Sequence, residues 1–192
     1  MPKTLPGAVS KLLGLLDSEA FIQRAERAKY QGEIIAVDWI ALLQRWTQDY
    51  RFEMANNVTP YLEPRGLDML FAKRRDWGQA SAPLESRYAI TGSFAAILYA
   101  PIVQPRLLTL YVQNTDAIAA QLGLRPAERG ANVLLAEPFD PVVFARPTER
   151  ERVIYSAVSP VAADLLTSSG RSPQEGAALL AWMEKHENEW RQ

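Results

Sequence analysis

Ile90-Thr91-Gly92-Ser93 is one of the few stretches of this sequence whose residue types could do chemistry. The stretch ends a predicted strand, Tyr88–Ser93, and precedes a predicted helix, Phe94–Leu98, so that backbone amides and a serine hydroxyl could hold a phosphate. Metal-assisted phosphoryl transfer would also need two carboxylates at alternate positions of the next strand. The next predicted strand, Leu107–Gln113, contains no acidic residue. We therefore expect no metal-dependent transfer at this turn.

Other candidates for catalysis are equally weak. Asp116, the first carboxylate after that strand, begins a predicted helix, where N-capping or the helix dipole explains it. The chain has no cysteine, and its one histidine, His186, lies in the polar end EKHENEWRQ, where we expect a solvated helix face. The Gly-Ser turn resembles that of nucleotidyltransferase folds, so the second domain is at most a degenerate nucleotidyltransferase-like scaffold. We predict no enzyme activity, no cofactor and no metal site.

Basic and small polar residues near the N-terminus are suited to contacting DNA. A helix is predicted over residues 4–17, because Val9, Leu12, Leu13 and Leu16 recur at helical spacing behind a Thr4 cap. A hairpin follows, with strands at Phe21–Arg24 and Glu33–Val37. The residues predicted to contact phosphates or bases lie on the polar helix face and on the hairpin: Lys3, Ser10, Lys11, Arg24, Arg27 and Lys29.

The order helix, strand, basic loop, strand is that of a winged helix-turn-helix, and Asp38 is predicted to cap a further helix, Trp39–Tyr50. We therefore predict a partial winged-helix domain over residues 1–54. A complete winged helix has two helices ahead of the recognition helix, and only four residues precede Leu5. We expect the apolar stripe of the first helix to be covered by homodimerisation or by the second domain.

The rest of the chain, residues 55–192, is predicted to be a mixed α/β domain that begins after a turn at Met54–Asn57. Two serine-proline pairs, Ser159-Pro160 and Ser172-Pro173, are predicted to start the last two helices, the second running to Trp190. The fold class is thus α+β. The remaining predicted elements alternate: a helix at Leu67–Arg74, the strands and helix described above, a helix at Thr115–Leu122, and strands at Asn132–Ala136, Val142–Phe144 and Val153–Tyr155.

Composition limits where the protein acts and what it binds. The formal net charge is -1, so any DNA binding must come from a local basic patch. The first residues lack the uninterrupted apolar region of a signal peptide, and no apolar run is long enough to cross a membrane. We expect a cytoplasmic protein that does not contact a membrane.

Five segments in order along the chain resemble the AbiEi-type regulators, the antitoxins of type IV toxin-antitoxin systems. The segments are LPGAVSKLLGLLD, VDWIALLQRWTQDYRF, YAITGSFAAILYAP, LGLRPAERGANVLLAEPFDPVVF and SPVAADLLTSSGRSPQEGAALLAWM. The resemblance implies a transcriptional autorepressor that binds double-stranded DNA of its own promoter and counters a partner toxin. It also implies that longer members carry a complete winged helix, of which this chain lacks the first two helices.

Two functions remain open from the sequence. The first is a DNA-binding transcriptional regulator that acts as a homodimer. The second is a protein-interaction subunit that does not bind DNA and contacts its partner through the second domain.

Overall fold

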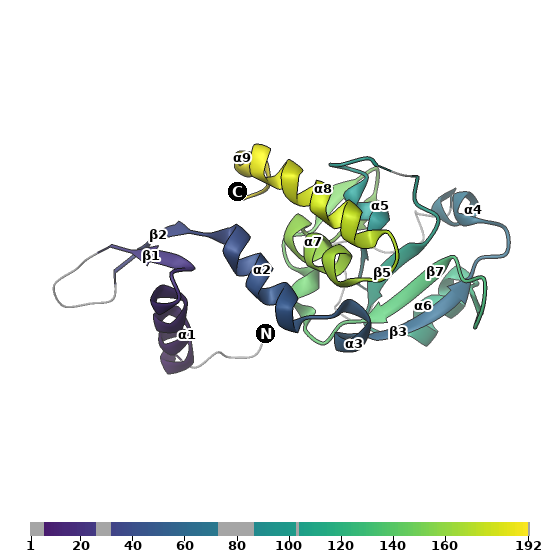
Figure 1. Cartoon of the computed structure of the whole chain (residues 1–192). Helices are drawn as coiled ribbons and strands as arrows, with labels where there is room; N and C mark the ends of the chain where they lie inside the picture. Colours follow the sequence, from purple (N-terminus) through teal and green to yellow (C-terminus); the bar gives the residue numbers. More distant parts are fainter. Residues whose placement is uncertain (1–5, 26–31, 73–86, 103, 192) are drawn as a thin grey trace. The chain divides into compact units, whose positions relative to one another are not determined.

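The computed structural model describes residues 6–25, 32–72, 87–102 and 104–191 (Figure 1). The chain divides into two compact units, Met1–Asp49 and Tyr50–Gln192. This division falls earlier than the expected boundary between residues 54 and 55. The expected turn at Met54 is instead part of helix α3 (Phe52–Ala55). Phe52 is buried, and its ring lies edge-on to that of Tyr111, also in the second unit, at a centroid distance of 6.0 Å.

The first unit has the predicted order of elements. Helix α1 (Pro6–Ser18) precedes strands β1 (Ile22–Arg24) and β2 (Ile34–Val37), and helix α2 (Trp39–Asp49) follows. The two strands pair antiparallel, and the Asp38 carboxylate accepts a 2.9 Å hydrogen bond from the Ala41 amide, which confirms the predicted cap.

The turn from α1 into β1 depends on a residue in the left-handed region. Ala20 has φ 61°, the Ala20 amide donates to Asp17 O, and the Phe21 amide donates to Leu16 O at 2.9 Å. This is the Schellman pattern that ends many helices, with alanine in the place where glycine is usual. The apolar stripe beside it is open within the unit, because Val9 and Leu12 are 41% and 55% exposed.

The second unit is built on one sheet. Among the described residues its strand order is β6-β3-β7-β5-β4-β9-β8, with β5 parallel to β7, β4 parallel to β9, and the other neighbours antiparallel. The strands are β3 (Asn57–Leu62), β4 (Tyr88–Thr91), β5 (Leu108–Val112), β6 (Arg125–Pro126), β7 (Val133–Glu137), β8 (Thr148–Arg150) and β9 (Val153–Tyr155).

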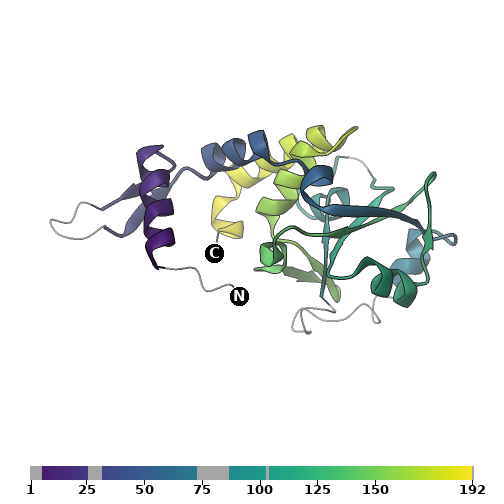
Figure 2. The ribbon, with the colours of Figure 1, turned by 90° about the horizontal axis from the view of Figure 1, so that it is seen from below.

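Helices cover both faces of the sheet. They are α4 (Leu67–Ala72), α5 (Ser93–Ala96), α6 (Thr115–Leu122), α7 (Val158–Thr167), α8 (Ser172–Lys185) and α9 (Glu187–Trp190). Figures 1 and 2 show α7 and α8 together on one side and α6 on the other. The two faces can be followed along β5: Leu110 lies against α6, whereas Tyr111 bonds to Asp164 of α7. A strand covered on both sides is buried along its whole length, and β5 is.

The mixed α+β architecture confirms the predicted fold class, and most predicted elements are present within a residue or two. The predicted strand Val142–Phe144 is wrong: these residues form a 3-10 helix, η3 (Pro141–Phe144), because Pro141 fixes its first φ and the Asp140 carboxylate accepts from the Val142 amide at 2.8 Å. Strands β3, β6 and β8 were not predicted.

Both helix starts after serine-proline pairs differ in detail from the prediction. Helix α7 begins at Val158 with Ala157 as its N-cap, and α8 follows Arg171; neither cap residue makes a side-chain cap hydrogen bond. The last helix also breaks at His186, which separates α8 from α9. No helix in the described part of the chain has the length and apolar character to cross a membrane.

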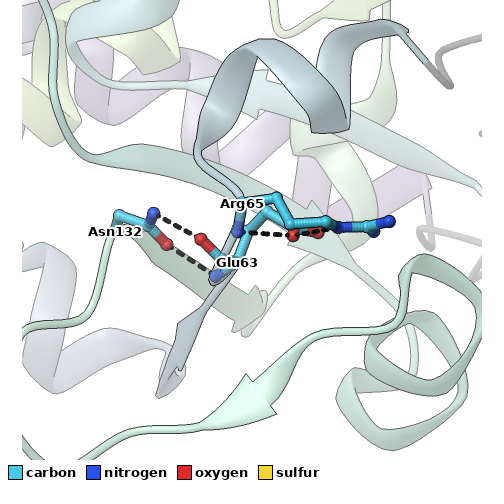
Figure 3. Close-up of polar contacts among 3 residues, drawn as sticks. All are labelled: Glu63, Arg65 and Asn132. Atoms are coloured by element: carbon cyan, nitrogen blue, oxygen red, sulfur yellow. Dashed lines mark hydrogen bonds and ion pairs between the residues drawn. The ribbon is translucent and has the colours of Figure 1, made fainter.

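A side-chain amide extends the pairing of β3 and β7 beyond the end of β3 (Figure 3). The Glu63 amide donates to Asn132 Oδ1 at 2.8 Å, and Asn132 Nδ2 donates to the Glu63 carbonyl at 3.1 Å. The Glu63 side chain is buried, and its Oε1 accepts from the Arg65 amide and from Arg65 Nε. The chain is thus held in place where it leaves the sheet.

Helices α7 and α8 approach closely at Gly176. A Cβ placed on Gly176 would lie 2.9 Å from the Leu166 backbone nitrogen and 3.1 Å from Leu165 Cβ. Real Cβ atoms do not come this close to backbone atoms, so the packing of the two helices requires glycine at this position.

We predict that Gly176→Ala destabilises the protein. Alanine is favoured over glycine in a helix by about 1 kcal/mol, but the contact with Leu166 opposes this gain, and overpacking costs about 1–3 kcal/mol. Urea denaturation followed by circular dichroism should show a lower midpoint. The control is Ala177→Gly at an exposed position of the same helix, which reports helix propensity alone. A midpoint raised by Gly176→Ala would contradict the close approach.

Candidate functional site

Three of the six residues predicted to contact DNA are described. Ser10 and Lys11 are consecutive, exposed residues of α1, and Arg24 is a half-buried residue of β1. By helical spacing, Ser10 and Lys11 share the face of α1 opposite Leu16, with Gly14 between them. Lys3, Arg27 and Lys29 lie outside the described residues. The structure therefore places two of the predicted residues on one open helix face.

Arg24 holds the hairpin together. Its Nε donates to the Gly32 carbonyl at 3.1 Å, and the Ala25 amide donates to Glu33 O at 2.9 Å, so that both bonds close the base of the loop. One side of the guanidinium is thereby used within the protein, and any phosphate would meet its remaining N–H groups. The role of Arg24 seen in the structure is to stabilise the hairpin.

The Gly-Ser turn is present between β4 and α5. Gly92 has φ 66° and ψ -150°, a backbone conformation that favours glycine, and α5 begins at Ser93. The turn borders a cavity of about 90 Å³ whose lining includes apolar side chains together with carboxylates and hydroxyls, among them Glu53, Asp164, Ser168 and Ser169.

This cavity does not suit a nucleotide phosphate. Sites for small organic ligands usually have volumes of about 300–1,000 Å³, so 90 Å³ is too small for a nucleotide. Two carboxylates and no lysine or arginine stand among its described lining residues, so an anion would be repelled. The turn therefore lacks the environment that phosphate binding needs.

The conspicuous polar group beside this turn is the Asp164 carboxylate, which is only 3% exposed. It accepts hydrogen bonds from Thr91 Oγ1 at 2.5 Å, from Tyr50 OH at 2.8 Å and from Tyr111 OH at 2.9 Å. Asn56 Nδ2 extends the cluster by donating to the Tyr50 hydroxyl at 3.0 Å. This one carboxylate connects Tyr50, the first residue of the second unit, with strands β4 and β5 and helix α7.

The electrostatics of the cluster follow from its burial. Burial raises the pKa of the Asp164 carboxyl to about 6, and the hydrogen bonds from the three hydroxyls oppose that rise. Burial and the neighbouring carboxylate both raise the pKa of Tyr50 and that of Tyr111. At neutral pH the cluster is thus an ionised carboxylate held by three neutral hydroxyl donors. Such an arrangement suits support of the fold.

Sequence reasoning missed the Asp164 cluster. The available signal was a single carboxylate inside the apolar helix segment Val161–Leu166, because a charge in such a position needs buried partners. Its partners come from Tyr50, Thr91 and Tyr111, which are far apart in the sequence, so that spacing alone could not identify them.

Two further polar side chains are engaged within the protein. Arg65 pairs with the buried Glu63. His186 was expected on a solvated face, which is wrong: it is half-buried, stacks on Trp182 at a centroid distance of 4.6 Å, and has Nδ1 2.8 Å from Trp182 O. In the described ranges no three His, Cys, Asp or Glu side chains are grouped so that they could hold a metal ion.

Comparison with models of known protein families gives a match. The model of a family described as a transcriptional regulator, AbiEi antitoxin, of type IV toxin-antitoxin systems matches residues 36–184. The matched residues run from β2 to α8 and leave α1 and β1 outside. No curated protein and no solved structure matches the chain.

We predict that Asp164 makes stability depend on pH. Its pKa is about 6 in the folded protein and about 3.9 in an unfolded chain. The folded state therefore binds this proton more tightly than the unfolded state does. Protonation of Asp164 thus contributes about 3 kcal/mol to the free energy of unfolding. This contribution is fully present below pH 4 and is lost as the pH rises through 6.

Urea unfolding of the wild type and of Asp164→Asn at pH 4 and pH 7 tests this. The stability of the wild type relative to the variant should be about 2 kcal/mol greater at pH 4 than at pH 7, because the unfolded chain is already half protonated at pH 4. Glu128→Gln, at an exposed carboxylate, is the control. A difference that does not change with pH would show that Asp164 titrates normally.

Proposed function

The chain belongs to the AbiEi antitoxin family of transcriptional regulators of type IV toxin-antitoxin systems, and on that premise we propose that it represses its own promoter by binding double-stranded DNA through its first unit. The observation that carries the proposal is the open polar face of α1 followed by the β1–β2 hairpin. A helix followed by a two-stranded wing is a common way to read a major groove and hold the adjacent backbone.

The chemistry of α1 supports this assignment. Lys11 and Ser10 are exposed side by side, and neither Gly7 nor Gly14 has other heavy atoms near its Cβ position. Small residues on this face let the helix backbone come close to a phosphate or a groove. Because the formal net charge of the chain is -1, binding must depend on a few local cations and will be sensitive to salt.

A homodimer would explain the apolar surface of the first unit. Val9, Leu12 and Leu15 of α1 are exposed, and so are Ile34 and Ile35 of β2. Exposed apolar residues grouped in this way are typical of association surfaces. A two-fold dimer would also present two copies of α1 to the two halves of an operator.

The second unit is the proposed contact for the partner toxin. The family match lies mostly within it. That match also supports the second candidate function, a subunit that counters a toxin through protein contacts without binding DNA, because the elements proposed to contact DNA lie largely outside the matched residues. We propose no enzymatic activity for either unit.

Lys11→Ala should weaken binding to DNA from the region upstream of the coding sequence. Removal of one phosphate contact should lower affinity several-fold and make the slope of log affinity against log salt less steep by about 0.9. Fluorescence anisotropy titrations at two or more salt concentrations measure both quantities.

The matched control is Lys185→Ala, at an exposed lysine of the second unit, which should leave both quantities unchanged. Equal affinity of the wild type for promoter and random duplex would refute specific recognition. Absence of any DNA binding, together with co-purification of a toxin partner, would favour the second candidate function.

A further inference from the structure

The second unit contains a second, larger cavity, of about 610 Å³, that lies apart from the Gly-Ser turn. Its walls come from Tyr99, which lies shortly after α5, from the segment η3–β8, from the first residues of α7, and from α8 and α9. A volume of this size is typical of sites for small organic ligands.

The cavity is positively charged. Arg146, Arg150 and Arg191 line it, and Glu189 is the one carboxylate among its described lining residues. Arg191 also pairs with Glu187, whereas no hydrogen bond or ion pair engages the side chain of Arg146 or Arg150 within the described residues. Two guanidinium groups are thus available for an anion, and arginine binds phosphate oxygens with two parallel hydrogen bonds.

Two features of the backbone favour an anion in the same cavity. Arg146 has φ 49°, a left-handed conformation that costs an arginine about 1 kcal/mol, and such strain is often found at binding sites. The ten-residue helix α7 begins at the cavity wall, where Ala157, Val158 and Ser159 form its first turn without a side-chain cap. Its free amide groups add to the positive potential that the arginines supply.

The cavity also has aromatic lining residues that are fixed in place. The rings of Tyr99 and Trp182 are 4.7 Å apart, and Trp182 stacks on His186. The Tyr99 hydroxyl donates to Thr148 Oγ1 at 3.4 Å, and Trp190 Nε1 donates to Met183 O at 2.9 Å. Rigid aromatic side chains beside arginines suit a ligand that carries both a flat ring and negative charge.

We propose that this cavity binds a nucleoside di- or triphosphate. The phosphates lie on Arg146, Arg150 and the start of α7, and the base lies against the wall formed by Tyr99 and Trp190. An inorganic anion would use the arginines alone and leave the aromatic wall unoccupied. The inference goes beyond the proposed DNA binding, because it concerns a different unit and a different set of residues.

Tryptophan fluorescence tests the proposal directly, because Trp182 and Trp190 line the cavity. The full chain is titrated with ATP, ADP, adenosine and inorganic tripolyphosphate, and isothermal titration calorimetry repeats each titration. We expect saturable binding of ATP or ADP that is at least tenfold tighter than that of either adenosine or tripolyphosphate. Saturable binding of neither nucleotide, or equal binding of ATP and tripolyphosphate, would overturn the proposal.

The double variant Arg146→Ala/Arg150→Ala locates the site. It should lower nucleotide affinity at least tenfold, with a thermal unfolding midpoint close to that of the wild type, because both side chains are exposed. Arg125→Ala, at an exposed arginine of β6 that does not line the cavity, should bind as the wild type does. Unchanged affinity in the double variant would overturn the assignment to this cavity. Arg150→Lys, which keeps the charge, provides a second variant should the double variant be unstable.

Discussion

The buried carboxylate of Asp164 is the interaction on which the second unit depends. An ionised group that is removed from water is costly unless it is fully hydrogen-bonded, and here three hydroxyls meet it from Tyr50, Thr91 and Tyr111. The three donors come from different parts of the chain. The need to hydrogen-bond the carboxylate therefore fixes the position of α7 against β4 and β5, and it fixes the position of Tyr50 at the start of the unit. Hydrophobic burial alone would tolerate small shifts between these elements, whereas three directional bonds to one group do not.

The same carboxylate disfavours phosphate binding at the Gly-Ser turn. Asp164 and Glu53 line the adjoining small cavity, which has no lysine or arginine among its described lining residues, so an anion would be repelled there. Positive charge is found elsewhere, at Lys11 on α1 and at Arg146 and Arg150 beside the larger cavity. The two proposed kinds of binding are assigned to these positions.

Much of the fold could be predicted from local patterns. The strong strand Leu108–Val112, the cap at Asp38 and the hairpin in the first unit follow from apolar periodicity and capping chemistry. Strand β3 could not be predicted, because it contains Pro60 and pairs with β7, which is more than 70 residues later in the sequence. The error at η3 is local: Pro141 and the Asp140 cap outweigh the apolar triplet that suggested a strand. Among the predicted DNA-contacting residues, the exposure of Lys11 agrees with its helical spacing, whereas the bond from Arg24 to Gly32 could not be inferred from sequence.

The most direct test of the account is hydrogen-deuterium exchange of the full chain with and without DNA from its own promoter. Backbone amides exchange more slowly where DNA covers or rigidifies the protein. Binding through the first unit predicts slower exchange in α1 and in the β1–β2 hairpin, while the amides of β4, β5 and α7 around Asp164 remain unchanged. Protection confined to the second unit, or no protection at saturating DNA, would contradict the claim that α1 and the hairpin form the DNA-binding surface.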